Sequence, residues 1–378
     1  MIDRAITQQI KQALIIGHKI IILYGPRQAG KTTLINILLQ DLPLDSFQKF
    51  IGDDLFTQDI FSRNELELLK RTVSDKKLLV IDEAQKIENI GNTLKLLIDN
   101  LPITILASGS ASFDLANKVS ESLAGRTKTF WLYPFSYKEI AEKYKQTSQS
   151  LMLEEFLRFG MFPAVHNLAT EKEKTDYLYE YLNTYLHKDI LTFENIRKPK
   201  KIIDLLSLLA LQIGKEVSIA ELARNLAISQ KAVQNYLDVL EKMFVIINIR
   251  GFSRNLRKEI AKTSKYYFMD TGLRNALLRN FNNLKMRGDS GELFENWFIV
   301  EKIKQANNTR QFSNFYFWRT YDKKEIDLIQ EKEGKLTGYE CKFSDKKQPN
   351  APKEWFSTYP QSEFKIVNPN NFKDLLNE

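Results

Sequence analysis

Residues 25–32 read GPRQAGKT and match the pattern G-x-x-x-x-G-K-[ST] at each of its fixed positions. An apolar run, residues 20–24, precedes this stretch, and a helix-like run, residues 33–39, follows it. A strand, a glycine-rich loop and a helix form the context in which this pattern binds phosphate groups. The stretch therefore predicts an α/β domain that binds a nucleotide.

The residues of the loop have distinct chemical roles in this prediction. Gly25 and Gly30 allow the backbone to curl so that its N–H groups point at phosphate oxygens. Lys31 is expected to reach the β- and γ-phosphates, and the hydroxyl of Thr32 to bind Mg²⁺. The loop thus implies ATP and Mg²⁺ as cofactors. The predicted nucleotide contacts here are Gly25, Pro26, Arg27, Gln28, Ala29, Gly30, Lys31, Thr32 and Thr33.

A second apolar run, residues 78–81, ends in Asp82 and Glu83. Such a run suits a strand that is buried on both faces of a parallel sheet. We expect Asp82 to hold Mg²⁺ through water and Glu83 to orient and deprotonate the attacking water. A protein that binds a nucleotide without hydrolysing it does not need Glu83. We therefore predict an ATPase in which Lys31 and Glu83 are catalytic.

Two further segments carry candidate site residues. A third apolar run, residues 103–107, leads into Ser108, which is expected to sense the γ-phosphate or position water; Ser-Gly-Ser is also ordinary turn chemistry. Arg126 precedes another apolar run, residues 130–134. An arginine there can reach the γ-phosphate of a neighbouring subunit and stabilise transition-state charge, which would require a homo-oligomer. A surface arginine at a helix end is the alternative.

These segments, in this order, resemble a known family. GPRQAGKT, LLVIDEAQ, ASGSAS, ESLAGR and LYPFS are similar to segments of the AAA-related P-loop ATPases of bacteria and archaea that carry a C-terminal domain of unknown function. FGMFPAV (159–165) and KYYFMDTGL (265–273) resemble two later segments of that family, although Met161 stands where a second glycine is usual. The resemblance covers nearly the whole chain. It implies an ATPase core, a helical lid, a winged helix and a nuclease-like end.

The composition is that of a globular protein with several domains. Of 378 residues, 43% are hydrophobic and 27% are charged, and no apolar run approaches the ~20 residues of a membrane span. Residues 1–20 lack the apolar core of a signal peptide, so we expect a cytoplasmic protein without membrane segments. The single cysteine, Cys341, fits a reducing compartment, and with only three histidines it argues against a zinc site.

We expect four domains. Residues 1–140 alternate apolar runs with helical patterns, as an AAA+-like α/β P-loop NTPase core does, and residues 141–205 are helical and suit a lid. Residues 206–285 have the pattern of a winged helix-turn-helix domain. Residues 286–378 suit an α/β restriction-endonuclease-like domain of the PD-(D/E)xK type.

The third of these segments is strongly basic. Residues 206–285 hold 13 Lys and Arg against 6 Asp and Glu, so +7 of the chain's net charge of +8 lies there. Ser218 and Ser229 cap two helical runs with helix-turn-helix spacing, and strand-like runs at 244–249 and 266–268 complete a winged helix. Double-stranded DNA is therefore the expected partner, although many winged helices bind proteins. The predicted base contacts are Gln230, Lys231, Gln234 and Asn235, and the predicted phosphate contacts are Arg250, Arg254, Arg257, Lys258 and Lys262.

The last segment carries a second candidate site. Asp327 near the end of one apolar run, followed by Glu340 and Lys342 on the next, resembles the PD-(D/E)xK nuclease motif. The two acids would share Mg²⁺, and the lysine would activate or orient water. Glu295, on a helix expected to be amphipathic and to open at Gly291, is predicted to complete the site.

Three observations weigh against cleavage by this site. Ile326 replaces the usual proline, residues 286–378 carry no net charge, and the Glu-x-Lys spacing recurs at Glu333/Lys335 and Glu363/Lys365. The sequence thus predicts a cytoplasmic Mg²⁺-dependent ATPase that binds DNA and couples its ATP state to DNA processing or defence. The alternative is a regulatory ATP switch whose winged-helix and C-terminal domains bind protein partners without cleaving DNA.

Overall fold

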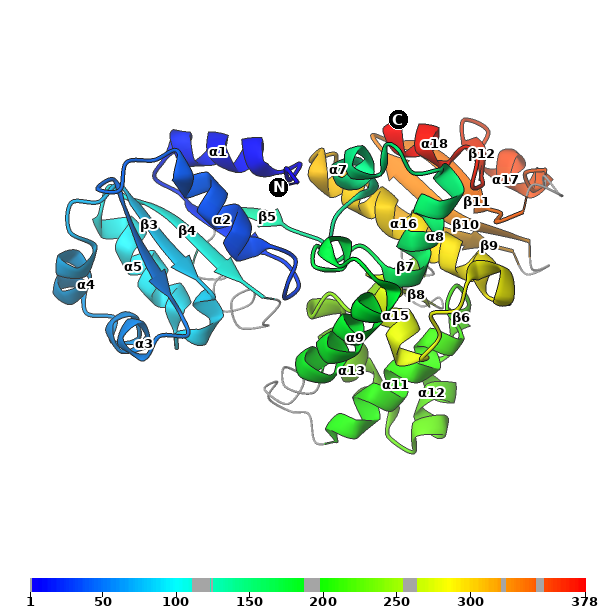
Figure 1. Cartoon of the computed structure of the whole chain (residues 1–378), viewed down its shortest axis with the longest axis horizontal. Helices are drawn as coiled ribbons and strands as arrows, with labels where there is room; N and C mark the ends of the chain where they lie inside the picture. The colour runs from blue at the N-terminus through cyan, green and yellow to red at the C-terminus, as the bar shows by residue number, and fades with distance from the viewer. Residues whose placement is uncertain are drawn as a thin grey trace. The chain divides into compact units, whose positions relative to one another are not determined.

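The computed structural model describes residues 2–110, 123, 125–186, 198–253, 264–320, 324–344 and 350–378. The chain divides into two compact units, whose elements Figure 1 labels. The first unit contains Met1–Pro134 and Lys242–Phe244, and the second contains Phe135–Glu241 and Val245–Glu378.

The first unit is built on a five-stranded parallel sheet with the strand order β2-β3-β4-β1-β5. The central strands are buried along their whole length, as expected for a parallel sheet covered on both faces. Because all strands run in the same direction, the loops after β1, β3 and β4 meet at one edge. The strands are β1 (Ile20–Tyr24), β2 (Phe47–Ile51), β3 (Leu78–Asp82), β4 (Thr104–Gly109) and β5 (Thr127–Trp131).

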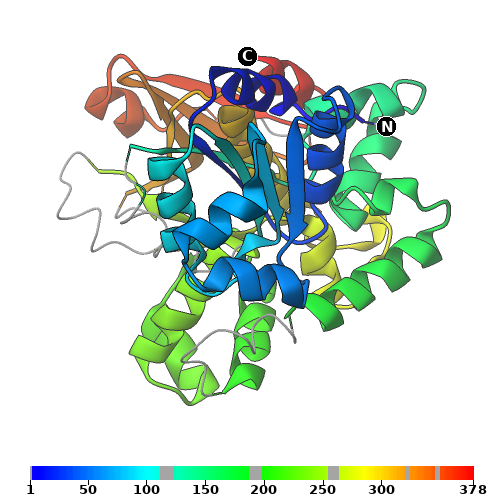
Figure 2. The same ribbon diagram turned by 90° about the vertical axis from the view of Figure 1, so that its left-hand side faces the viewer.

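Helices cover both faces of this sheet (Figure 2). Alternate residues of a strand point to opposite faces, so Ile21 and Leu23 pack with α1 and α2, whereas Ile20 and Ile22 pack with α3, α4 and α5. This arrangement confirms the prediction of an α/β P-loop fold. The helices are α1 (Thr7–Ile16), α2 (Lys31–Gln40), α3 (Leu55–Ser62), α4 (Leu66–Val73) and α5 (Ile90–Asn100), with a 3₁₀ turn η1 (Ala84–Lys86).

The second unit contains a seven-stranded sheet with the order β12-β11-β10-β9-β7-β8-β6. Its strands are β6 (Glu216–Val217), β7 (Ile246–Gly251), β8 (Ser264–Phe268), β9 (Asn314–Arg319), β10 (Glu325–Lys332), β11 (Lys335–Cys341) and β12 (Glu363–Val367). Its helices are α7 (Tyr137–Ile140), α8 (Gln149–Phe159), α9 (Glu171–Tyr181), α11 (Pro199–Leu211), α12 (Ile219–Leu226), α13 (Gln230–Lys242), α15 (Thr271–Leu277), α16 (Ser290–Asn308), α17 (Lys353–Thr358) and α18 (Phe372–Asn377). Shorter turns are η2 (Ala141–Tyr144), η3 (Val165–Asn167), η5 (Leu284–Met286) and a π-helical turn, η4 (Leu182–Leu186).

The seven-stranded sheet crosses the boundary that we expected at residue 285. β7 pairs in parallel with β9, with Arg250 opposite Tyr316 and Gly251 opposite Phe317. The β7–β8 hairpin alone would leave the backbone groups of β7 unpaired along one edge, and β9 satisfies them. The strands on the two sides of residue 285 therefore belong to one sheet and not to two.

The two segments that carry the later part of the family resemblance pack on each other. The buried carboxylate of Asp270 accepts hydrogen bonds from the N–H of Met161 at 2.6 Å and of Leu273 at 3.1 Å. A Cβ atom on Gly160 would lie 2.0 Å from Asp270 Oδ1, and one on Gly272 would lie 2.2 Å from the carbonyl oxygen of Phe159. Glycine is thus required at 160 and 272, whereas residue 161 contributes its backbone N–H and tolerates methionine.

Two expectations for the helices of the second unit need comment. The segment expected as a lid lies in the second unit, where α8 and α9 pack against α15; its role over the nucleotide stays a prediction. The helix expected to be amphipathic, α16, is instead buried on most of its sides, including the charged residues Glu301, Lys302 and Lys304. The reason is that α8, α15, α18, β8 and β11 all pack against it.

Candidate functional site

The glycine-rich loop lies at the carboxyl end of β1 and leads directly into α2. Gly30 precedes the helix with a φ of +94°, in the left-handed region that favours glycine. A Cβ atom on Gly25 would lie 2.1 Å from the carbonyl oxygen of Leu132, just beyond β5. Both glycines of the motif are therefore required by the shape of the loop before any ligand is considered.

The lysine and the threonine of the motif are already placed for a phosphate and its metal ion. Lys31 is 4% exposed, and its ammonium group donates to the carbonyl oxygens of Gly25 and Pro26, both at 3.0 Å. Thr32 Oγ1 donates to Asp82 Oδ2 at 2.7 Å, although 50 residues separate them. A hydroxyl and a carboxylate in contact, beside a loop lysine, are the donor set expected for Mg²⁺ bound with nucleotide phosphates. The residues present fit ATP and Mg²⁺.

Ser108 contacts both acids at the end of β3. Its side chain is fully buried, and its hydroxyl donates to Asp82 Oδ1 and accepts the N–H of Glu83 at 3.1 Å. The hydroxyl therefore positions the two acids of β3, and its role toward a γ-phosphate or water stays a prediction. The parallel pairing of β3 with β4 brings these residues together.

Glu83 is held in a sparsely populated backbone conformation. Its φ is +54°, which is uncommon for a residue other than glycine and is typical of functional sites. Gly52, after β2, donates its N–H to the carbonyl oxygen of Asp82 at 2.7 Å, and a Cβ there would lie 2.2 Å from the carbonyl oxygen of Glu83. The neighbouring strand thus fixes the turn that presents Glu83 at the edge of the sheet.

The structure adds two residues to this site that the sequence analysis missed. The side-chain amide of Gln85 donates to the carboxylate of Glu83 and to Ser110 Oγ at 2.9 Å, so it links both strand ends. The guanidinium group of Arg4, 9% exposed, donates to the carbonyl oxygens of Ala29 at 2.7 Å and Tyr133 at 2.5 Å. Gln85 is recognisable by its place two residues after Glu83, but no sequence signal marks Arg4.

Arg126 has the geometry of the alternative that we described for it. Its Nε donates to Asp99 Oδ1 at 2.6 Å, and both side chains are about one-third exposed or more. It is thus a surface arginine in an ion pair of its own chain. Contact with the nucleotide of a neighbouring subunit stays a prediction.

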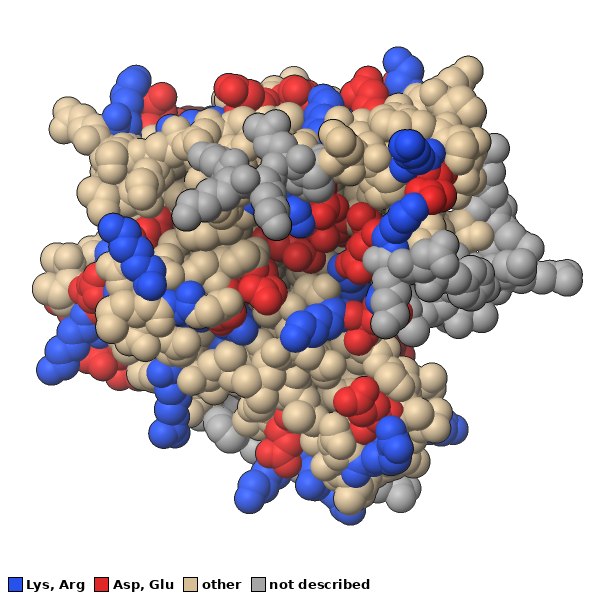
Figure 3. Space-filling model, turned by 90° about the vertical axis from the view of Figure 1, so that its right-hand side faces the viewer, with Lys and Arg blue, Asp and Glu red and all other residues tan. Residues whose placement is uncertain are grey.

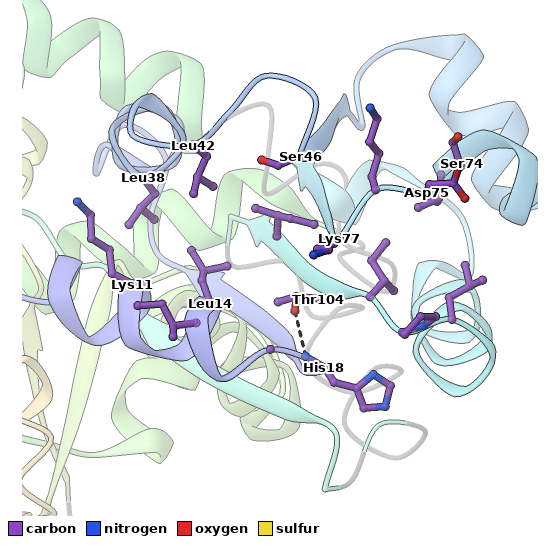
Figure 4. Close-up of a pocket in the computed structure, with 18 of the residues that line it drawn as sticks. Lys11, Leu14, His18, Leu38, Leu42, Ser46, Ser74, Asp75, Lys77 and Thr104 are labelled. Carbon is purple, nitrogen blue, oxygen red and sulfur yellow. Dashed lines mark hydrogen bonds between the residues drawn. The ribbon is translucent and has the colours of Figure 1, made fainter.

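The first unit also has a cavity of about 840 Å³, which lies away from the phosphate loop. Leu14, Leu38 and Leu42 form part of its apolar wall, and the N–H of His18 donates to Thr104 Oγ1 at 3.0 Å beside it (Figure 4). Thr104 begins β4, so this cavity lies at the amino ends of the strands. Ligands of open α/β sheets bind at the carboxyl ends, where the glycine-rich loop lies.

The predicted DNA-contact residues on α13 share one face. The side chains of Val233, Tyr236, Leu237 and Leu240 are buried, as expected for the inner face of the helix. Gln230, Lys231, Gln234 and Asn235 are all exposed, as is Arg250 on β7. The other predicted contacts, Arg254, Arg257, Lys258 and Lys262, lie outside the described residues.

Ser218 and Ser229 cap the two helices of this segment as predicted. Ser218 Oγ accepts the N–H of Glu221 at 3.3 Å, and Ser229 Oγ accepts the N–H of Ala232 at 3.2 Å. After α13, β7 and β8 pair in antiparallel fashion and form the expected hairpin. The local arrangement is therefore two capped helices followed by a hairpin.

The C-terminal candidate residues also come together. Leu328 on β10 lies opposite Tyr339 on β11, which places Asp327 opposite Glu340 on one face of the sheet. Lys342 Nζ lies 2.7 Å from Glu340 Oε1. Burial, and next the negative charges of Glu295 and Glu340, raise the pKa of Asp327 well above its usual range. Acidic side chains gather in a hollow on the face of the second unit shown in Figure 3, with basic side chains beside them.

These acids are nevertheless not arranged as a metal site. Among the residues that the structure describes, no group of three or more His, Cys, Asp or Glu side chains is placed to hold a metal ion. Asp327 Oδ2 accepts the N–H of Cys341 at 2.8 Å, and Glu295 Oε1 accepts the hydroxyl of Tyr267 at 2.7 Å. The side chains therefore do not fit the Mg²⁺ site that the resemblance to PD-(D/E)xK nucleases implies.

Three family models match parts of the chain. Residues 17–141 match an AAA domain. Residues 150–284 and residues 290–373 match two different domains of unknown function. The first match supports ATP binding and hydrolysis by an AAA-related P-loop domain, as the sequence predicted. The other two assign no activity to the rest of the chain.

Relatives occur in bacteria and archaea. An uncharacterized protein of Mycobacterium tuberculosis is 29% identical over 328 residues, which cover 85% of this chain and 70% of that protein. One of Methanocaldococcus jannaschii is 27% identical over 305 residues, covering 76% of this chain and 67% of that protein. Neither relative has an assigned activity.

Two solved structures of DNA- or nucleotide-bound proteins show weak similarity. The ORC1 protein of Aeropyrum pernix in complex with DNA has a TM-score of 0.35 at 13% identity, covering 73% of this chain and 92% of that one. AMPPCP-bound DnaA of Aquifex aeolicus has a TM-score of 0.29 at 20% identity, covering 62% and 86%. Scores this low do not establish a common fold.

In the described part of the chain, no helix combines the length and the apolar composition needed to cross a membrane.

Proposed function

We propose that the first unit is a Mg²⁺-dependent ATPase and that the chain couples its ATP state to the handling of double-stranded DNA. The observation that supports the ATPase most directly is the contact of Thr32 with Asp82, beside the buried ammonium group of Lys31. Two segments that are distant in the sequence thereby meet at the carboxyl edge of one sheet, where open α/β folds bind ligands.

Each residue has a role in this proposal. The N–H groups of residues 27–30 and of the start of α2 bind the phosphates, and Lys31 offsets the charge of the β- and γ-phosphates. Thr32 and Asp82 hold Mg²⁺, which neutralises charge that develops on the phosphates. Glu83 orients the attacking water and accepts its proton, and Gln85 fixes the direction of the Glu83 carboxylate.

Phosphate release from ATP tests this proposal. Turnover is expected with Mg²⁺ and not with excess EDTA, and Lys31→Ala is expected to abolish it. Glu83→Gln should still bind ATP but lose on the order of 10²–10⁴-fold in turnover, as expected when a general base is removed. Lys11→Ala, on α1 in an ion pair with Asp41, is the matched control and should retain full activity. Full activity of Lys31→Ala would refute the assignment.

We further propose that residues 206–285 act as a winged helix that binds duplex DNA. The support is the exposed polar face of α13 and the net charge of +7 within this segment. Residues 286–378 then form a restriction-endonuclease-like part of the same sheet, since β10 and β11 present Asp327 and Glu340 on one face. A cytoplasmic location and a homo-oligomer are parts of the same proposal.

DNA binding is tested by anisotropy of a labelled duplex at two salt concentrations. The double variant Lys231→Ala/Gln234→Ala, which removes two predicted base contacts, should weaken binding. Arg250→Ala, which removes a predicted phosphate contact, should reduce the salt slope by about 1. Lys172→Ala, an exposed lysine on α9 outside the basic segment, is the control and should bind as the parent does. Stimulation of ATP turnover by duplex DNA would connect the two activities.

A regulatory switch that acts on protein partners is the second candidate, favoured by the poor fit of the C-terminal acids to a metal ion. It predicts ATP turnover that is indifferent to DNA, and no nicking of plasmid DNA that depends on Asp327.

A further inference from the structure

We propose that the side chain of Lys265 supplies the cation of the C-terminal acidic cluster, so that this cluster is an internal ion-pair site and does not bind a divalent metal ion. The acidic cluster consists of Glu295, Glu325, Asp327 and Glu340. This proposal is independent of the ATPase assignment, because it concerns only side chains of the second unit.

Lys265 lies in the middle of the carboxylates. It comes from β8 and is 1% exposed, and it forms an ion pair with Glu325 of β10. Its Nζ also lies 3.9 Å from Glu295 Oε1 of α16 and 5.3 Å from the centre of the Phe317 ring. A buried ammonium group is retained in a protein only when carboxylates or other acceptors surround it; here β10 and α16 each supply a carboxylate, and β9 supplies the aromatic ring.

Three other carboxylates of the cluster are already engaged by protein groups. Glu295 and Asp327 each accept a hydrogen bond from a protein donor, the Tyr267 hydroxyl and the Cys341 N–H. Glu340 shares one oxygen with Lys342 at 2.7 Å, which leaves Glu340 Oε2 buried without a hydrogen-bond partner. Each of these three carboxylates thus engages one of its two oxygens with a protein group, which lowers its capacity to bind Mg²⁺ or Mn²⁺, ions that take about six oxygen ligands.

A divalent ion bound by Glu295 and Glu325 would compete with the ammonium group of Lys265 for the same carboxylates. That group has almost no exposed surface, so displacement would leave it buried without its partners. Displacement is therefore unfavourable, because the buried charge of Lys265 would stay uncompensated. The same ion pairs connect β8, in the hairpin after α13, with β10 of the C-terminal segment. The cation thus joins the candidate DNA-binding segment to the nuclease-like strands.

Mn²⁺ binding to the full-length chain, measured by electron paramagnetic resonance of the free ion, tests the proposal. All proteins carry Asp82→Asn so that the nucleotide site does not contribute. With Lys265 intact, no Mn²⁺ site that depends on Asp327 is expected. Lys265→Met should gain one site, on the order of tenfold or more tighter than any binding by the parent, and Asp327→Asn should remove it.

Lys302→Met is the matched control. Lys302 is also buried in this unit, at 3% exposed, but it donates to the carbonyl oxygen of Leu375 and not to the acidic cluster. It should gain no Mn²⁺ site. The proposal is overturned if the protein with Lys265 intact binds Mn²⁺ and Asp327→Asn abolishes that binding. It is also overturned if Lys265→Met folds, as judged by its melting curve, and gains nothing. Should Lys265→Met not fold, the comparison of Asp327→Asn with its parent still decides.

Discussion

Replacement of His166 should remove a large part of the acid sensitivity of the second unit. The imidazole is 5% exposed and packs among the rings of Phe135, Tyr144 and Phe156. Burial, and then the charges of Lys143 and other lysines, lower its pKa from 6.5 to about 3. Its Nδ1 is hydrogen-bonded to the Tyr144 hydroxyl at 2.9 Å, whereas Nε2 has no partner, so the ring is neutral in the folded chain.

The sign and size of the effect follow from this pKa. Well above pH 6.5 the ring is neutral in both the folded and the unfolded chain, so it makes no pH-dependent contribution to the free energy of unfolding. Between pH 6.5 and about 3 only the unfolded chain binds a proton, so the free energy of unfolding falls as the pH falls. Linkage gives a loss of about 2 kcal/mol between pH 7 and pH 5 from this one group.

Urea unfolding at pH 7 and pH 5, followed by tryptophan fluorescence, measures this loss. Trp297, Trp318 and Trp355 all lie in the second unit. His166→Phe keeps an aromatic ring but has no imidazole to bind a proton. Between pH 7 and pH 5 the free energy of unfolding of this variant should therefore fall by about 2 kcal/mol less than that of the parent. Tyr144→Phe removes the hydrogen bond but keeps the buried imidazole, so it should retain most of the parent's pH dependence. Equal pH dependence in His166→Phe and the parent would refute the reasoning.

Three further variants test particular contacts. Gln85→Ala should lower kcat for ATP about tenfold without changing KM, because the Glu83 carboxylate loses a hydrogen bond that orients it; an unchanged kcat would contradict this. Gly272→Ala should destabilise the second unit by about 1–3 kcal/mol in thermal unfolding, since its Cβ would meet the Phe159 carbonyl, whereas Gly291→Ala on α16, where nothing lies within 4 Å, should be neutral or stabilising. Arg4→Met should weaken ATP binding about tenfold in a titration with a fluorescent analogue, because the loop loses two charge-assisted hydrogen bonds, and equal affinity would exclude this role.

The sequence predicted those parts of the nucleotide site whose residues are neighbours in the chain. A phosphate loop needs its two glycines and its lysine within eight residues, so residues 25–32 are recognisable without a structure. Asp82 and Glu83 likewise end one apolar run. Arg4 and Ser108 act across 25 residues or more, and nothing in the residues next to them indicates which carbonyl or carboxylate they meet.

The second unit shows the same limit of prediction from sequence more clearly. The pattern at Asp327, Glu340 and Lys342 predicted which side chains share a face, because strand alternation and a short turn decide that locally. It did not predict Lys265, which reaches Glu325 across 60 residues and changes the expected chemistry of the site. It also did not predict the burial of α16, whose polar residues are accommodated by partners elsewhere, such as the Tyr137 N–H that donates to Glu301.

The pairing of β7 with β9 has a consequence for how the chain folds during translation and for where it can be divided into fragments. The ribosome synthesises β7 and β8 before β9. One edge of β7 therefore stays unpaired until residues 314–319 have been synthesised. A fragment that stops at residue 285 keeps that edge open permanently, and an open strand edge is a template for pairing with other copies. Residues 206–285 are therefore not expected to form a stable fragment by themselves. Fragments intended for separate expression should keep β7 and β9 in one polypeptide.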